Sequence, residues 1–247
     1  MINKSRLKFY ASLKDRKART ESGLFIAEGH KAVQEGLKSG CPCEAAFVRE
    51  GFFGENEETD RLLSNQTVEV LEERDFRRLA NTESPQGVLA VFDRRGLLAE
   101  SPTAEDLIVL HDLADPRNMG TIIRSADWFG FRDILVGETC VDIFNEKVVR
   151  STMGSIFHCR FILAADLAAN LRALKPEYRV LTADTGGVDY RNRRRGGKTA
   201  VVFSNETRGP SDAVLALTDE RITIPGFGQA ESLNVSCAAA VNLASYR

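Results

Sequence analysis

The chain has 247 residues, of which 43% are apolar and 28% charged, and its formal net charge is −2. This composition is ordinary for a globular protein and allows one large or two small domains. No run of about 18 apolar residues is present, which excludes a membrane-spanning helix. The basic N-terminus lacks the apolar stretch of a secretory signal, so we expect a cytoplasmic protein.

The N-terminal part, residues 1–93, alternates short apolar runs with segments of helical periodicity. The helix predicted over residues 30–40 closes on Gly40, and a glycine commonly follows the end of a helix. The pattern predicts a small α/β domain with strands at 22–29, 45–48, 68–71 and 87–92 and helices at 30–40 and 73–84. Residues 94–106 break this pattern and contain a Ser-Pro pair, so we interpret them as a linker.

The C-terminal part, residues 107–247, carries short and almost continuously apolar runs separated by helical segments. We predict strands at 107–113, 133–137, 178–184, 199–205 and 221–225. Such strands are typical of a parallel sheet covered by helices on both faces. Because ligands of these sheets bind beyond the carboxyl ends of the strands, residues that follow each strand are candidates for a site.

The segment after the first of these strands reads as an amphipathic helix that begins at Asp115-Pro116. Apolar residues recur at 119, 122, 123, 126 and 129, and a second stripe carries Arg117, Thr121, Arg124 and Trp128. Arginines on such a helix are often only solvated surface. The position of Asn118 and Arg124 beyond a strand end favours a functional role instead.

Two further segments place polar groups beyond strand ends. The apolar run 201–203 leads into Ser204, Asn205 and Glu206. The run 222–225 leads into a glycine loop at 226–228, and Ser232 and Asn234 follow before a helix of small residues. Glycines permit close approach of the backbone to a ligand. We expect Ser232 to cap the final helix.

Two phosphate-binding patterns are incomplete. Gly197-Lys198-Thr199 resembles the end of a P-loop, but Asn192 stands where the first glycine is needed, and the segment leads into a strand. Gly226 and Gly228 lack the third glycine of a dinucleotide fingerprint, since Glu231 occupies that position. A nucleotide-dependent oxidoreductase is therefore disfavoured.

Three ordered motifs carry a resemblance to a known family. The patterns NxGxxxR at 118–124, NExRG at 205–209 and IPxxGxxESLNVS at 224–236 resemble the motifs of the SpoU/TrmH family of RNA 2′-O-ribose methyltransferases. The resemblance covers residues 107–247. In the N-terminal part, FIAEG at 25–29 and SPQG at 84–87 resemble the substrate-binding domain that many members carry.

The resemblance implies a SPOUT domain, in which a parallel α/β sheet ends in a trefoil knot, preceded by the small α/β substrate-binding domain. Such knots are rare exceptions to the usual topology rules. The resemblance also implies a homodimer with S-adenosylmethionine bound in the knot, a site completed across the interface, and a structured RNA as substrate. We favour ribosomal RNA over tRNA because of the N-terminal domain.

Site residues follow from the same resemblance, position by position. The implied catalytic residues are Asn118, Arg124, Glu206, Ser232 and Asn234, and the implied cofactor contacts are Ser204, Asn205, Ile224, Pro225, Gly228 and Leu233. Two positions depart from the family, which usually has glycine at Ser204 and often at Thr207. A side chain at position 204 could crowd the cofactor.

The implied reaction transfers a methyl group to a ribose 2′-oxygen. Family proposals make Arg124 the base, but a guanidinium with a pKa above about 12 is a poor base, so we expect it to clamp a phosphate and stabilise the developing alkoxide. We expect Asn118, Ser232 and Asn234 to orient the nucleophile, and Glu206 to hold Arg124 or loop amides. The alternative is a non-catalytic RNA-binding protein with the same fold.

Charge and cysteine patterns add two expectations. Residues 191–198 hold five basic residues and no acid, which could follow a phosphate backbone, although such runs are often only solvated surface. The predicted RNA contacts are Arg117, Arg191, Arg193, Arg194 and Arg195. The five cysteines lack the spacing of a zinc site, so we expect reduced thiols and no metal.

Overall fold

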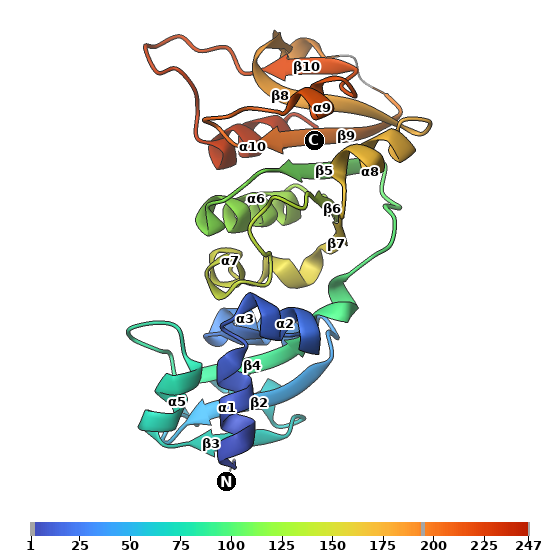
Figure 1. The fold of residues 1–247 in the computed structure, drawn as a ribbon. Helices are drawn as coiled ribbons and strands as arrows, with labels where there is room; N and C mark the ends of the chain where they lie inside the picture. The colour runs from blue at the N-terminus through green and yellow to red at the C-terminus, as the bar shows by residue number, and fades with distance from the viewer. Residues whose placement is uncertain (1–2, 194–195, 247) are drawn as a thin grey trace. The chain divides into compact units, whose positions relative to one another are not determined.

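The computed structural model describes residues 3–193 and 196–246 of the chain, which forms two compact units (Figure 1). The first unit contains the residues up to Leu97 together with Asp142–His158. The second contains Leu98–Val141 and the residues from Cys159 onward. Among the described residues, no helix is both long and apolar enough to cross a membrane.

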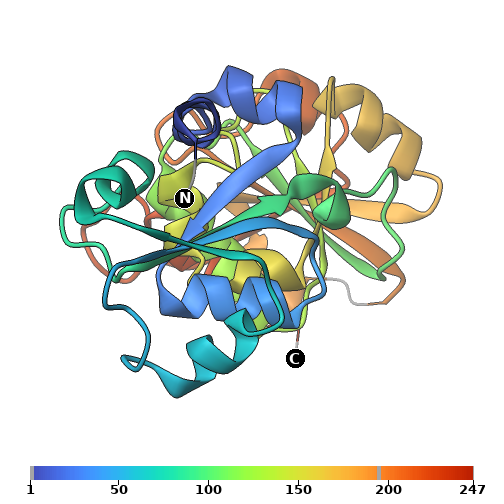
Figure 2. The same ribbon diagram turned by 90° about the horizontal axis from the view of Figure 1, so that it is seen from below.

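The first unit is built on a four-stranded mixed sheet in the order β1-β4-β2-β3. Strand β4 pairs antiparallel with β1 and β2, and β2 pairs parallel with β3. Figure 2 shows α1 and α5 on one side of this sheet and α3 and α4 on the other. The elements are α1 (Lys4–Ser12), α2 (Arg16–Ser22), β1 (Leu24–Glu28), α3 (His30–Lys38), β2 (Cys43–Arg49), α4 (Glu57–Leu63), β3 (Val68–Leu71), α5 (Glu73–Leu79) and β4 (Val88–Asp93).

Segment 142–158, which includes α7 (Glu146–Ser151), completes the aromatic core of the first unit. The Phe25 ring lies 4.9 Å from the Phe144 ring, and the Phe92 ring lies 4.8 Å from the Phe157 ring. Helix α3 approaches this cluster closely at Gly36, where an added Cβ would lie 2.4 Å from Phe92. The sequence predicts one continuous C-terminal domain over 107–247, but segment 142–158 belongs to the first unit because its aromatic side chains are buried there.

The second unit is a six-stranded sheet in the order β10-β8-β9-β5-β6-β7, and every strand pair is parallel. The predicted α/β fold with a parallel sheet is confirmed. Strand β7 was not among the predicted strands. The elements are β5 (Asp106–His111), α6 (Pro116–Trp128), β6 (Asp133–Val136), β7 (Arg160–Leu163), α8 (Leu167–Leu174), β8 (Tyr178–Asp189), β9 (Lys198–Ser204), α9 (Asp212–Leu215), β10 (Glu220–Thr223) and α10 (Val235–Ala244).

Both faces of this sheet are buried. One set of strand residues, including Val109, Val180 and Val202, packs with Leu171 of α8 and Val214 of α9. Alternate strand residues such as Ile108, Leu110, Val201 and Phe203 are also buried. Helices α6 and α10 pack against each other, and α10 also packs against β9. The near-continuous apolar runs in the sequence follow from this two-sided burial.

Helix α6 has the predicted structure. The Asp115 carboxylate accepts a hydrogen bond from the backbone N–H of Arg117 at 2.7 Å, which caps the helix, and Pro116 is its first residue. Its buried stripe consists of Met119, Ile122, Ile123 and Ala126, together with Gly120. The predicted polar stripe faces outward, with Arg117, Thr121, Arg124 and Trp128 exposed.

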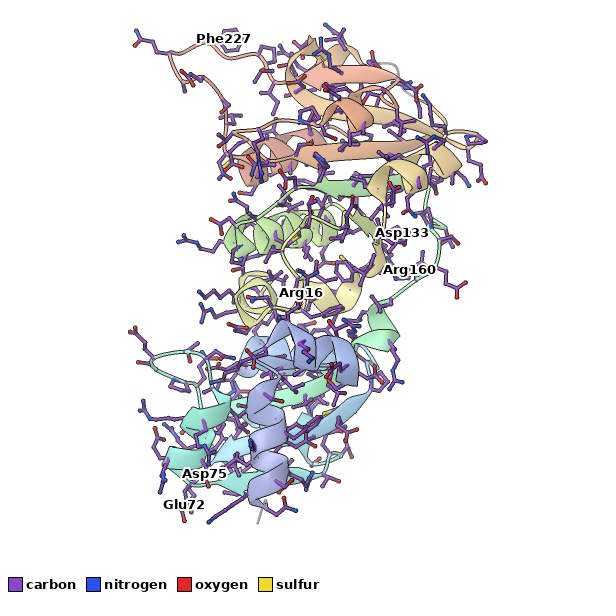
Figure 3. The ribbon with its side chains drawn as sticks, viewed as in Figure 1. Arg16, Glu72, Asp75, Asp133, Arg160 and Phe227 are labelled. Atoms are coloured by element: carbon purple, nitrogen blue, oxygen red, sulfur yellow. The ribbon has the colours of Figure 1, made fainter. Side chains whose placement is uncertain are left out.

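A buried carboxylate fixes the amino ends of β6 and β7. Asp133 has no exposed surface and accepts hydrogen bonds from the backbone N–H groups of Thr103 and Ala104 at 2.6 and 2.8 Å. Arg160 donates to the same carboxylate through Nε at 2.9 Å, and Figure 3 labels both partners. Because a buried charge is tolerated only when it is paired, this cluster joins segment 98–105 firmly to the sheet.

Candidate active site

A cavity of about 740 Å³ lies at the carboxyl ends of β9 and β10. Its size lies within the range of pockets that bind small molecules. The walls come from four parts of the second unit, namely residues 183–185 of β8, 206–209 after β9, 222–228 and 230–233 around β10 and the following loop, and Val235, Ala238 and Asn242 of α10. The sheet edge thus carries the site that the carboxyl-end rule predicts.

An arch in strand β8 forms one wall. Arg221 and Ile222 are neighbours in β10, yet they pair with Thr182 and Val188 of β8, so residues 183–187 bulge out of the ladder. Gly187 is required there, because an added Cβ would lie 2.5 Å from the Arg221 carbonyl. Arg221 donates a hydrogen bond to Asp184 at 3.1 Å and so ties the arch to β10.

Three side chains from separate segments form a hydrogen-bonded chain beside the cavity. Asn234 Nδ2 donates to Asn118 Oδ1 at 3.0 Å. Asn118 Nδ2 in turn lies 3.4 Å from Glu206 Oε1. The three residues come from the start of α10, the first turn of α6 and the turn after β9. Three of the five predicted catalytic residues therefore lie together.

Asn234, not Ser232, caps the final helix. The Asn234 side-chain oxygen accepts from Ser236 N at 2.9 Å and from Ser236 Oγ at 2.6 Å. The capping role predicted for Ser232 is wrong, because α10 begins only at Val235 and Ser232 stays in the exposed loop. Ser232 lines the cavity and so remains beside the other predicted site residues.

Ser204 does not crowd the cavity. Its side chain is buried, and its Oγ lies 3.2 Å from Nδ1 of His111 at the end of the neighbouring strand β5. Burial lowers the pKa of His111, and the nearby carboxylates of Asp112 and Glu138 oppose this effect. Neither Ser204 nor Asn205 belongs to the described cavity walls, and their contact with the cofactor stays a prediction.

Asn205 organises the turn after β9 instead. Its side-chain oxygen accepts from the backbone N–H groups of Thr207 and Arg208 at 2.9 and 3.1 Å. The Arg208 guanidinium forms an ion pair with Asp112 at 2.8 Å. Asp112 itself has a left-handed backbone, with φ of 57°, directly after β5. These contacts hold the wall that carries Glu206.

The other predicted cofactor contacts do line the cavity. Ile224, Pro225, Gly228 and Leu233 all belong to its walls. Asp184 and Thr185 were missed, although the predicted strand 178–184 ended there and the carboxyl-end rule could have pointed to them. The cavity therefore combines apolar side chains with the carboxylates of Asp184, Glu206 and Glu231.

Arg124 stands apart from this cavity. It is exposed on α6, and it makes no ion pair with another residue of ranges 3–193 and 196–246. The expected contact between Glu206 and Arg124 is not seen, because Glu206 meets Asn118 instead. Trp128, one turn further along α6, leaves 83% of its surface exposed.

The predicted RNA-binding arginines differ in their surroundings. Arg117 is exposed at the start of α6, and Arg191 is exposed with its guanidinium beside Asp189. Arg193 is buried, lies 3.8 Å from the centre of the Tyr246 ring and donates to Ser245 Oγ at 2.8 Å. The predicted RNA contact of Arg193 is wrong for this geometry, because its guanidinium is used inside the fold. Arg194 and Arg195 lie outside the described residues.

A cluster of three or more His, Cys, Asp or Glu side chains suited to a metal is absent from the described part of the chain. The cysteines in the described residues are unpaired, and burial raises the pKa of the Cys41 and Cys43 thiols to about 12 and about 11. Burial therefore disfavours the thiolate form of Cys41 and Cys43.

Two family profiles together match most of the chain. Residues 106–244 match the SpoU rRNA Methylase family. Residues 4–90 match the MRM3-like substrate binding domain. The two matched ranges meet near the segment predicted as a linker.

Relatives of the whole chain carry related names. The 23S rRNA (guanosine(2553)-2′-O)-methyltransferase RlmP of Bacillus subtilis is 32% identical over 96% of this chain and 93% of its own length. A solved structure titled a putative RNA methyltransferase of the TrmH family from Porphyromonas gingivalis has a TM-score of 0.88 at 29% identity and covers 100% of this chain and 98% of its own.

A second solved structure contains a cofactor. The SpoU methyltransferase AviRb from Streptomyces viridochromogenes, in complex with AdoMet, has a TM-score of 0.86 at 25% identity and covers 98% of this chain and 97% of its own. The similarity extends over both units of the present chain, so the arrangement of strands around the cavity is shared.

Proposed function

The chain belongs to the SpoU rRNA methylase family, and on that premise we propose that it is an S-adenosylmethionine-dependent enzyme that methylates a ribose 2′-hydroxyl of ribosomal RNA. The observation that carries the proposal is the hydrogen-bonded chain of Asn118, Glu206 and Asn234 beside a cavity of cofactor size. A non-catalytic RNA-binding protein would have no need for this arrangement next to an open cavity.

The cavity suits S-adenosylmethionine in its chemistry. Ile224, Pro225 and Leu233 offer apolar surface for an adenine, and the carboxylates of Asp184 and Glu231 match the positive charges of the sulfonium and the amino group. When bound, the cofactor supplies the methyl group on an electrophilic sulfonium. Ser204 and Asn205 would support this wall from behind through His111 and the backbone of the turn.

The chain's own residues would position and activate the ribose. Asn234 and Asn118 hold the start of α10 against the first turn of α6, which fixes the loop that carries Ser232. Ser232, which is exposed and lines the cavity, would orient the 2′-hydroxyl. Arg124 would clamp the adjacent phosphate and stabilise the negative charge that develops on the 2′-oxygen.

We further propose a homodimer built on α6 and α10. Trp128 of α6 and Val241 of α10 leave 83% and 37% of their surfaces exposed, and the two helices pack against each other. Arg124 does not line the cavity of its own chain. A second copy docked on these helices would bring an Arg124 to each cavity. Light scattering of the purified protein tests the dimer.

A trefoil knot is part of the same proposal. Strand β10 is at the edge of the sheet, whereas α10 packs against β9 and α6. The segment between β10 and α10 must therefore cross back from the sheet edge, past β8, to reach β9. A trefoil knot at the carboxyl end requires such a return.

We propose 23S ribosomal RNA as the substrate, because the relative RlmP is named for a guanosine of that RNA. The test is to map 2′-O-methyl groups in total RNA from cells with and without the gene, with the equivalent of guanosine 2553 inspected first. Loss of a methyl group in tRNA alone would redirect the assignment. Calorimetry that detects no binding of S-adenosylmethionine would favour the non-catalytic alternative.

The cytoplasmic location stays a prediction.

RNA binding is tested by its salt dependence. Replacing Arg117 and Arg191 with glutamine should weaken RNA binding and reduce the slope of log affinity against log salt by up to about 2, because each lost phosphate contact removes about one released counterion. An unchanged slope would show that these two arginines are only surface charge. Arg193→Gln should instead lower the thermal stability, because its guanidinium packs on Tyr246.

A further inference from the structure

Phe227 is an aromatic side chain with no protein surroundings. It leaves 93% of its surface exposed, and Figure 3 shows it on the outer part of the loop between β10 and α10. Other exposed phenylalanines of the chain have ring partners. Phe53 is 55% exposed but contacts the Phe52 ring at 5.9 Å, and Phe9 contacts Tyr10 at 5.3 Å. A ring so exposed contributes nothing to the folded core.

The glycines on either side of Phe227 are not explained by the conformation of the loop. An added Cβ at Gly226 or Gly228 would meet no atom within 4 Å, and neither residue has a left-handed backbone. At Gly29, by contrast, φ is 93° and an added Cβ would lie 2.6 Å from Gln86. The two glycines therefore allow the backbone of residues 226–228 to change conformation, or allow a ligand to approach that backbone closely.

The location of Phe227 favours a ligand larger than the cofactor. The loop lines the mouth of the cavity, while Ile222 and Val235 are its buried wall residues. Arg208, which pairs with Asp112 at 2.8 Å but keeps its side chain 65% exposed, lines the same cavity and can also face a phosphate. An aromatic face beside a cation is the combination by which proteins hold single-stranded nucleic acid, with the ring stacked on a base.

We propose that Phe227 is a stacking platform for an unpaired RNA base next to the ribose that is methylated. This inference rests on the proposed function and adds the class of substrate, a nucleotide in a loop or an opened helix. A base inside a duplex already stacks on both neighbours, so it offers no free face to the ring. Phe227 is thus a positioning residue for the RNA, on the part of the loop that also lines the cavity.

The first test compares Phe227→Ala with Phe227→Trp and with a matched control, Leu163→Ala. Leu163 is 45% exposed at the end of β7, the opposite edge of the same sheet. The substrate is an unmodified 23S rRNA hairpin that contains the equivalent of guanosine 2553. Phe227→Ala should raise the KM for this hairpin about 5- to 150-fold, the range for loss of one base–aromatic stack. Phe227→Trp and Leu163→Ala should keep the wild-type KM.

The second test separates the RNA from the cofactor. Calorimetry should give the same Kd for S-adenosylmethionine in the wild type and in Phe227→Ala. An increased Kd with an unchanged KM for RNA would make Phe227 a cofactor lid and overturn the proposal. A change from dimer to monomer in light scattering would overturn it in favour of a contact between subunits.

The third test does not depend on catalysis. A single-stranded RNA of the same loop sequence, with 2-aminopurine in place of one base, should lose fluorescence on binding to the wild type because stacking quenches it. Phe227→Leu should abolish this quenching, and the same RNA annealed to its complement should show none with either protein. If the wild type quenches but does not methylate, the proposed function fails while the stacking proposal stands. Equal quenching by wild type and Phe227→Leu overturns the stacking proposal.

Discussion

Polar side chains are buried and fully hydrogen-bonded at one end of the six-stranded sheet, and are mostly exposed to solvent at the other. At the amino ends of β6 and β7, the buried Asp133 carboxylate is fully occupied by Arg160 and two backbone N–H groups. At the carboxyl ends, Ser232 beside the cavity and Arg124 on α6 stay exposed. The pairs that do form there, such as Asn118 with Glu206 and Arg208 with Asp112, keep much of their side-chain surface in solvent.

This difference separates stability from function within one sheet. A satisfied buried ion pair cannot bind anything else, because all its partners belong to the fold. Exposed groups around a cavity have lost no solvation and remain free to bind a ligand. The same charged residue types therefore stabilise one end of the sheet and are available for chemistry at the other.

The largest effect is expected at the exposed end. Arg124→Ala should lower kcat about 100- to 1,000-fold, the usual loss when one stabilising donor is removed from a developing oxyanion. The melting temperature and the Kd for S-adenosylmethionine should not change, because Arg124 is exposed and does not line the cavity. Wild-type turnover in this variant, measured by transfer of a labelled methyl group to 23S rRNA, would refute its assigned role.

At the amino ends of β6 and β7, a substitution should change the stability of the protein. Asp133→Ala should lower the free energy of unfolding by about 3 kcal/mol, because Arg160 and two backbone N–H groups lose their acceptor. Chemical denaturation monitored by circular dichroism measures the change. Glu177→Ala, which removes an exposed pair with Lys198, should leave the stability as it is and serves as the control. Equal losses in the two variants would contradict the comparison.

Asn234 both stabilises the fold and belongs to the proposed active site. Its replacement should therefore lower stability and kcat, each by a moderate amount. Asn234→Ala removes the cap of α10 and should cost about 1 kcal/mol of stability. It also breaks the bond to Asn118, so kcat should fall as well. Asn234→Ser should restore most of the stability but not kcat, because serine can cap the helix but is too short to reach Asn118. Recovery of both by serine would show that capping is the only role.

The smallest effect is a pH dependence at His111. Burial lowers its pKa in the folded protein below the unfolded value of about 6.5. The unfolded chain then takes up the proton first, so this residue's stabilisation is complete above pH 6.5 and is lost as the pH falls through the folded pKa. His111→Gln should flatten the curve of unfolding free energy against pH below 6.5. A curve of unchanged slope would mean that other groups cause the dependence.

Much of the second unit could be predicted from its sequence. Five of its strands were predicted within a few residues because two-sided burial makes each one a continuous apolar run. Strand β7 was missed although the apolar run 161–165 covers most of it, because the strand has only four residues and begins at the charged Arg160. The helix cap at Asp115 was predicted because Asp-Pro is a strong local signal.

Other features depend on contacts that no local pattern reveals. Ser232 and Asn234 are both good capping residues, and only the point where the loop enters α10 decides between them. The arginine run 191–195 looks uniform, yet Arg193 is drawn inside by Tyr246 from the far end of the chain. The inward position of Ser204 likewise depends on His111 of a neighbouring strand.

The return of segment 142–158 to the first unit limits how the chain can be divided. A fragment that starts at Leu98 would carry Phe144 and Phe157 without Phe25 and Phe92, against which they pack. A fragment that ends at Leu97 would leave the other half of that aromatic cluster in water. Both pieces would tend to aggregate through these faces. The boundary between the two family matches, near residues 90–106, therefore does not coincide with the division into two compact units, because segment 142–158 belongs to the first unit.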